Sequence, residues 1–223
     1  MTDPGEPAGP TAADRRFDRY WDRQAPGYDR AMAFSERRLF RDTRAWLCGR
    51  AGGRTLEVAV GTGLNLPHYP AGLQLTGLER SPRMAGLARR RADELGLTVD
   101  LRIGDAQQLP FPDAWFDTVV CTFALCCIPD ERRALAEMAR VVRPGGLLLL
   151  ADHVRSTAWP VRILQAAVDV VSVPWHGEHH RRRPLPQVEA LGFAVEGHDR
   201  FTLGMIERLA ARRPGDGTPS TGP

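Results

Sequence analysis

An α/β fold with a mostly parallel sheet is predicted by two features of the sequence. Short apolar runs recur at residues 56–60, 73–78 and 116–122, and segments of helical pattern separate them, as expected for buried parallel strands. The first run stops at Gly61-Thr62-Gly63, where a backbone without Cβ atoms can turn sharply and let a ligand approach. Parallel sheets of this kind bind ligands outside the carboxyl ends of their strands.

Three segments outside the predicted sheet have distinct compositions: the two ends of the chain and the segment that follows the N-terminal end. Residues 1–12 and 214–223 are rich in Pro, Gly, Ser and Thr, so both tails are expected to be disordered. Residues 13–48 have a helical pattern that is interrupted at Pro26-Gly27 and carries several aromatic residues. This helical segment either packs on the sheet or covers a bound ligand as a lid, with Tyr28 as the best candidate contact.

Glu57 interrupts the first strand just before the glycine turn. A carboxylate at this place would repel phosphate groups, and Leu66 stands where a dinucleotide-binding turn has its third glycine. The turn therefore suits a cationic nucleoside better than a nicotinamide dinucleotide.

The second strand, residues 73–79, ends in Glu79, which lies 18 residues after Gly61. An acidic side chain at this strand tip can accept hydrogen bonds from both hydroxyls of a ribose. Ser81-Pro82 then begins a helix that ends at Gly96. We therefore expect a ligand that contains a nucleoside.

The third and fourth strands, residues 98–103 and 116–122, end in further candidate ligand contacts. Asp105 could accept a hydrogen bond from an adenine amino group while the Ala106 N–H faces a ring nitrogen, although an aspartate after glycine is also a common turn residue. Thr122 and Phe123 would face the reacting part of the ligand, or they could simply pack in the core.

A helix over residues 131–142 precedes the fifth strand, residues 147–151, which closes on Asp152-His153. A histidine at a strand tip could act as a general base or hold a substrate, or it could cap the following loop. Two last strands, residues 193–200 and 204–211, are predicted to form a hairpin.

The helix predicted over residues 158–175 has few polar positions, so we expect it to be buried or to line an apolar pocket. His176, His179 and His180 follow it, but their spacing suits no closed zinc site. The three arginines at 181–183 would also repel a cation. We therefore expect no metal.

Composition indicates an ordinary globular domain. The chain has 223 residues, 43% of them hydrophobic, and a net charge of +3, which gives no indication of nucleic-acid binding. All 30 basic residues are arginines. The four cysteines lack paired spacing, and together with the absence of a secretory leader they predict reduced thiols and a cytoplasmic protein.

Four motifs together resemble those of class I S-adenosylmethionine-dependent methyltransferases: Glu57-x-x-x-Gly61-x-Gly63, Glu79, Gly104-Asp105-Ala106 and Arg143-Pro-Gly-Gly146. The resemblance implies a Rossmann-like seven-stranded sheet with helices on both faces, its last strand antiparallel, an N-terminal helical lid over 13–48 and a binding domain over 49–213. Ala59 departs from the family, which usually has glycine there. S-adenosyl-L-methionine is the implied cofactor, and its expected contacts are Tyr28, Glu57, Ala59, Gly61, Gly63, Asn65, Glu79, Arg80, Asp105, Ala106, Thr122 and Phe123.

A closer resemblance extends beyond the cofactor motifs. Asn65, Cys126, Asp152-His153-Val154 and Trp175-His176 are similar to residues of methyltransferase-like thiol S-methyltransferases and of the related bacterial phosphatidylethanolamine N-methyltransferases. This resemblance implies a small or lipid-like acceptor held by residues 153–185. S-methylation of a hydrophobic thiol is the best hypothesis, with His153 and His176 as candidate catalytic residues that could stabilise a thiolate.

Other functions remain open at this stage. A lipid amine, a quinone or a natural product could be the acceptor, and the basic region from Arg15 to Arg44 could then rest on a membrane. The chain could bind S-adenosylmethionine without catalysis, for which Ala59 is the only support. A nicotinamide dehydrogenase is disfavoured by Glu57 and Leu66.

Overall fold

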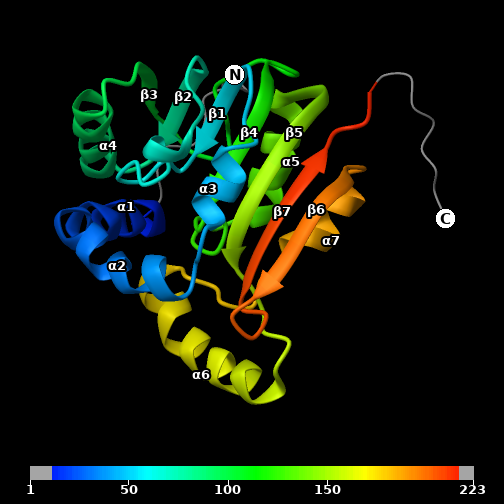
Figure 1. Cartoon of the computed structure of the whole chain (residues 1–223). Helices are drawn as coiled ribbons and strands as arrows, with labels where there is room; N and C mark the ends of the chain where they lie inside the picture. The colour runs from blue at the N-terminus through cyan, green and yellow to red at the C-terminus, as the bar shows by residue number, and fades with distance from the viewer. Residues whose placement is uncertain (1–11, 216–223) are drawn as a thin grey trace, which may run out of the picture.

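The computed structural model describes residues 12–215, except for the side chains of residues 12–14 and 174–176. Its centre is a seven-stranded sheet in the order β3-β2-β1-β4-β5-β7-β6, in which β7 runs antiparallel to both of its neighbours (Figure 1). The predicted mostly parallel sheet of seven strands is confirmed. The strands are β1 (Arg54–Val58), β2 (Gln74–Glu79), β3 (Val99–Ile103), β4 (Phe116–Thr122), β5 (Val142–His153), β6 (Ala194–Phe201) and β7 (Ile206–Arg212).

Helices cover both faces of this sheet, as predicted (Figure 1). On one face α5 and α7 pack on the core that contains Val119, Cys121 and Leu148. On the other face α3 packs near Val120 and Leu149. This alternation follows the period of two along a strand. The helices are α1 (Ala12–Gln24), α2 (Tyr28–Arg38), α3 (Thr43–Cys48), α4 (Pro82–Glu94), α5 (Glu131–Val141), α6 (Trp159–His176) and α7 (Pro184–Ala190), with short 3-10 turns at Ala25–Gly27 and Leu66–His68.

The fifth strand differs from the prediction at its start. It was expected to begin at residue 147, but β5 begins at Val142, directly after α5. Pro144-Gly145-Gly146 therefore lies inside the strand, at an irregularity opposite β4. A Cβ on Gly146 would lie 2.8 Å from the Asp117 carbonyl oxygen. Glycine is thus needed because the two backbones approach closely.

The helix α6 also differs from the prediction. We expected a buried helix or a pocket wall, but most of its large apolar side chains are exposed, with Val170 74% and Trp159 70% accessible. It lies outside the two helical layers, below the carboxyl ends of the strands in Figure 1. The helix α7 and the turn at Leu66–His68 were not predicted. Within residues 12–215, no helix is both long enough and apolar enough to span a membrane.

Candidate functional site

One pocket opens at the carboxyl ends of the parallel strands, where the order of strands reverses between β1 and β4. Its walls come from the segments that follow β1, β2, β3 and β4, and α1 and α2 close one side. This is the place where open α/β sheets bind ligands. Of the expected cofactor contacts, nine line the pocket: Tyr28, Ala59, Gly61, Glu79, Arg80, Asp105, Ala106, Thr122 and Phe123.

Glu79 joins the two strand ends that frame the pocket. Its carboxylate accepts hydrogen bonds from the backbone N–H groups of Gly61 and Ser81, both at 2.8 Å. Burial raises the pKa of Glu79, and these N–H groups oppose the rise. The Arg80 N–H also donates to this carboxylate, which offers about four acceptor sites, so one site stays available to a ribose hydroxyl.

Asp105 is held in place by donors from the protein. The Arg80 guanidinium lies 3.0 Å from its carboxylate, and the Gln107 N–H donates to it at 2.8 Å. Arg80 also pairs with Asp18 of α1 at 2.5 Å. The part of the pocket where Asp105 and Ala106 lie is therefore tied to the helical segment.

The three other expected cofactor contacts, Glu57, Gly63 and Asn65, do not line the pocket. Glu57 points to the α3 face of the sheet and is fully buried. There it accepts hydrogen bonds from Asn65 Nδ2 and from the Tyr69 hydroxyl, both at 2.9 Å. Burial raises the pKa of Glu57 to about 7, and these donors limit the rise. Glu57 therefore supports the wall of the pocket from behind.

Arg44 of α3 lines the pocket and was missed by sequence reasoning. Its guanidinium donates to Asn65 Oδ1 at 2.8 Å and to the Thr122 hydroxyl at 3.2 Å. It pairs with Glu36 at 2.6 Å, and it lies 5.2 Å from the centre of the Phe123 ring. The pocket thus has a buried cation beside Thr122 and Phe123. Nothing local distinguishes Arg44 among so many arginines.

Aspartates of α1 and α2 fasten these helices to the rim of the pocket. Asp22 accepts a hydrogen bond from the Ser81 hydroxyl at 2.5 Å, and Asp29 accepts one from the Thr62 hydroxyl at 2.6 Å. Arg91 of α4 also pairs with Asp29. Phe17, Trp21 and Tyr28 contribute the aromatic lining on this side.

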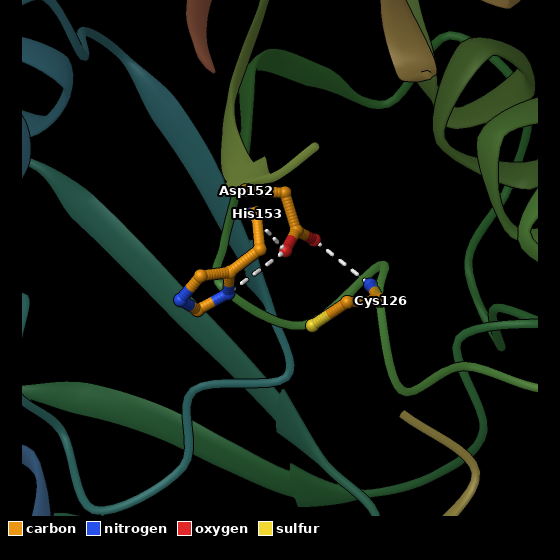
Figure 2. Close-up of side chains that lie close together, drawn as sticks. All are labelled: Cys126, Asp152 and His153. Atoms are coloured by element: carbon orange, nitrogen blue, oxygen red, sulfur yellow. Dashed lines mark hydrogen bonds and ion pairs between the residues drawn. The ribbon is translucent and has the colours of Figure 1, made fainter. Parts of the chain in front are cut away.

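His153 lies at the end of β5 beside, and not on, the pocket wall. Figure 2 shows the Asp152 carboxylate between the Cys126 backbone N–H, which donates at 2.9 Å, and the His153 ring, whose Nδ1 lies 3.6 Å away. The ring also lies 5.5 Å from that of Phe123. Burial alone would lower the pKa of His153, but Asp152 and Cys126 raise it to about 10. A raised pKa favours the imidazolium form, which would suit the stabilisation of an anion better than the role of a general base.

The other predicted catalytic residue, His176, ends α6, and its side chain is outside the described residues. The Nδ1 of the nearby His180 lies 3.0 Å from the Asp169 carboxylate, which also pairs with Arg181. Two groups elsewhere bring three potential metal ligands together, Cys126-Asp152-His153 and Cys126-Cys127-Glu178. In the first group, Asp152 already accepts backbone N–H groups through both oxygens.

Comparison with known proteins agrees with this arrangement. Residues 56–150 match the family model described as a methyltransferase domain. A phosphatidylethanolamine N-methyltransferase of Cereibacter sphaeroides is 40% identical over 131 residues, which are 57% of this chain and 64% of that protein. A demethylmenaquinone methyltransferase of Renibacterium salmoninarum is 40% identical over 112 residues, which are 50% of this chain and 46% of that protein. The chain thus spans less than two thirds of these relatives.

Solved structures agree at the level of the fold. The [4+2]-cyclase SpnF superimposes with a TM-score of 0.70 and 20% identity, over 95% of this chain and 99% of that chain. At this identity the likeness establishes the fold alone. A structure described as a cyclase also illustrates that one fold can serve different reactions.

Proposed function

We propose that this chain, whose residues 56–150 form a domain of the methyltransferase family, is an S-adenosylmethionine-dependent methyltransferase that acts on a small or lipid-like acceptor. One observation carries the proposal: the buried Glu79 carboxylate bridges the Gly61 turn and the start of α4 at the switch point of the sheet. This geometry presents a hydroxyl-binding carboxylate and a glycine turn to the same ligand.

The residues around the pocket suggest how the donor is held. Glu79 would bind the ribose, and Asp105 and the Ala106 backbone would bind the adenine. The amino-acid end of the donor would then lie toward Thr122 and Phe123, where Arg44 supplies a buried cation for its carboxylate. The α1–α2 segment would act as the lid, since Trp21 and Tyr28 close that side of the pocket.

Methyl transfer itself requires no covalent intermediate with the protein. The bond between the methyl group and the donor sulfonium breaks as the acceptor's lone pair forms the new bond in line, and S-adenosylhomocysteine leaves. The main contribution of the protein is alignment of the two reactants. A thiol acceptor must also lose its proton, because the thiolate is the nucleophile.

A hydrophobic thiol remains our preferred acceptor. The observation that favours it is the cationic His153 ring, which lies 5.5 Å from Phe123 of the pocket wall and could stabilise a thiolate there. A lipid amine or a quinone is the second candidate, because the relatives described above are named for such acceptors. A cytoplasmic location stays a prediction.

Calorimetric titration with S-adenosylmethionine, S-adenosylhomocysteine and NAD tests the donor site. We expect the first two ligands to bind and NAD not to bind, with affinity lost in Glu79→Ala and kept in the exposed control Glu94→Ala. Binding of NAD alone would contradict the proposal. Binding of S-adenosylmethionine without transfer to any thiol, phosphatidylethanolamine or quinol would leave a non-catalytic binding protein.

The pH dependence of thiol methylation tests His153. In the wild type the charge of the imidazolium is present below a pH of about 10, so the thiolate should be available below its ordinary pKa. His153→Gln should shift the rising limb of the rate profile to higher pH by roughly one unit. An unchanged profile would rule out this role.

A further inference from the structure

The helix α6 buries its polar side and exposes its apolar side, which is the reverse of an ordinary surface helix. Over residues 159–173, its buried positions are the polar residues Gln165, Asp169 and Ser172, at a spacing that is apolar in an ordinary surface helix. Each makes hydrogen bonds to the backbone that follows or precedes the helix. Gln165 Nε2 donates to the Val154 and His180 carbonyl oxygens at 2.9 and 3.0 Å. Asp169 accepts from the His180 N–H at 2.9 Å, and Ser172 donates to the Glu178 carbonyl at 2.9 Å.

The outward side of α6 is apolar over the length of the helix. We call the exposed side chains Trp159, Ile163, Leu164, Val168, Val170 and Val171 the α6 apolar face; their exposed fractions range from 41% to 74%. Leu203, in the β6–β7 turn, is also 63% exposed, and its carbonyl accepts a hydrogen bond from the Ser156 hydroxyl at 2.6 Å, which brings this turn close to the start of α6. Soluble proteins rarely leave a continuous apolar surface uncovered without a use for it.

The terminal segments of this sequence have little with which to cover that face. Residues 1–11 and 216–223 contain a single large apolar side chain, Met1. These two segments therefore do not supply an apolar partner for the α6 apolar face.

The charges beside the face indicate which kind of partner it takes. Arg155 and Arg162 flank the start of α6, and Arg183 follows the loop after it; all three are exposed. They gather around Arg200. Burial lowers the pKa of Arg200, and the three neighbouring guanidinium groups lower it further by repulsion. The buried Glu207, 3.4 Å from Arg200, is the acidic group that offsets this cluster.

An apolar helix face next to a cluster of arginines is complementary to an anionic lipid surface. Tryptophan at one end of such a helix is typical of the boundary between headgroups and acyl chains. We propose that the α6 apolar face docks this protein on anionic membranes, with α6 lying along the surface and Arg155, Arg162 and Arg183 contacting lipid phosphates.

This surface, on α6, differs from the basic region 15–44 that the sequence suggested as a membrane contact. Arg44, at the end of that region, is buried at the pocket. The helix α6 lies below the carboxyl ends of the strands (Figure 1), which is the end of the sheet where the pocket opens. The docking rests on α6 and the arginines that flank it, and it is independent of which acceptor the pocket takes.

Vesicle flotation of the full chain tests the docking. The probes are vesicles of phosphatidylcholine alone and vesicles in which about a third of the lipid is phosphatidylglycerol. We expect at least tenfold stronger binding to the anionic vesicles. Ile163→Glu/Val171→Glu should lose at least tenfold of that binding, whereas Leu95→Glu/Leu191→Glu, at exposed apolar sites elsewhere, should keep it.

Several outcomes would overturn the proposal. The first is that the wild type does not bind anionic vesicles, and the second is that the α6 double variant binds them as the wild type does. The third is that light scattering shows the wild type to be a dimer and the α6 double variant a monomer. As a second measurement, spin-labelled lipid should quench the tryptophan fluorescence of the wild type more than the tryptophan fluorescence of Trp159→Phe. Titration of each variant with S-adenosylmethionine without vesicles verifies folding. Loss of that binding in every protein, wild type included, would contradict the proposed function and leave the docking result standing.

Discussion

Arg44 and Glu57 illustrate how a binding pocket depends on groups behind its wall. Arg44 reaches the pocket from α3, and Asn65 and Thr122 orient its guanidinium. Glu57 anchors the same Asn65 from the other side. A buried group in such a network is costly to leave unpaired. The cation that would bind the donor's carboxylate is therefore positioned in part by Asn65 and Glu57, which do not line the pocket.

Replacement of Arg44 should weaken binding of the amino-acid end of the donor and leave binding of its nucleoside end unchanged. We expect Arg44→Gln to lower the affinity for S-adenosylmethionine by roughly ten- to a hundredfold, the value of a charge-assisted hydrogen bond. The affinity for methylthioadenosine, which lacks the amino-acid carboxylate, should be nearly unchanged. Calorimetry on both ligands, with the exposed Arg50→Gln as control, measures the difference. Equal losses for both ligands would show that Arg44 only maintains the fold.

Glu57 should make the stability of the protein depend on pH. Its pKa is about 7 in the folded state against an ordinary value of 4.5, so between these values the folded state holds a proton that the unfolded state has released. This contribution to stability is present below pH 4.5 and is lost as the pH rises to about 7, at a cost of about 3 kcal/mol.

Urea unfolding at pH 4.5 and pH 7 checks this expectation. Glu57→Gln should lose much less stability over this interval than the wild type, and the exposed control Glu94→Gln should behave as the wild type does. His153 titrates higher, between its ordinary value of 6.5 and about 10, and so contributes little here. If the free energy of unfolding changes with pH as much in Glu57→Gln as in the wild type, the pH dependence belongs to other groups.

At the scale of elements, aspartates hold the α1–α2 segment to the rim, beside the packing of Met32 on the core and the Glu36–Arg44 pair. Asp18, Asp22 and Asp29 each contact a residue of the pocket rim. Partly exposed pairs of this kind are worth no more than about 1 kcal/mol each. A segment fastened so weakly can open and close at a modest cost, as a lid requires.

The variant Asp22→Asn/Asp29→Asn should open this segment more often. We expect trypsin to cleave within residues 12–38 roughly tenfold faster than in the wild type, and S-adenosylmethionine should suppress cleavage of the wild type. Asp100→Asn, which removes a pair within β3, serves as the control. Equal cleavage rates would mean that the aspartates do not hold the helices.

For the whole molecule, the pocket couples ligand binding to global stability. Its walls come from the ends of four strands and from the helices α1, α2, α3 and α4, so a ligand that binds only the folded chain stabilises all of them together. At a hundred times its dissociation constant, a ligand adds about 2.7 kcal/mol.

Thermal unfolding should report this coupling directly. S-adenosylmethionine at that concentration should raise the Tm by about 5–10 °C, whereas NAD should leave it unchanged. The increase should disappear in Glu79→Ala, which lacks the bridging carboxylate. Equal stabilisation by NAD would indicate a general nucleoside site.

Much of the fold and half of the site followed from local patterns. Apolar runs predicted the inner strands β1, β2, β4 and β5, because a strand buried on both faces needs a continuous apolar sequence whatever surrounds it. The glycine turn, Glu79 and Asp105 follow strands directly, so their position at one edge of the sheet was predictable. The family resemblance drawn from these motifs is confirmed over residues 56–150.

What local pattern could not predict depends on contacts between distant residues. The Arg44–Thr122 hydrogen bond joins residues 78 apart in sequence, and no spacing rule indicates it. The inward turn of Glu57 depends on Tyr69 and Asn65, and the orientation of α6 depends on hydrogen bonds to the backbone on either side of it. Composition alone assigned α6 to the interior, because hydropathy records how apolar a helix is and not which of its faces the rest of the chain contacts.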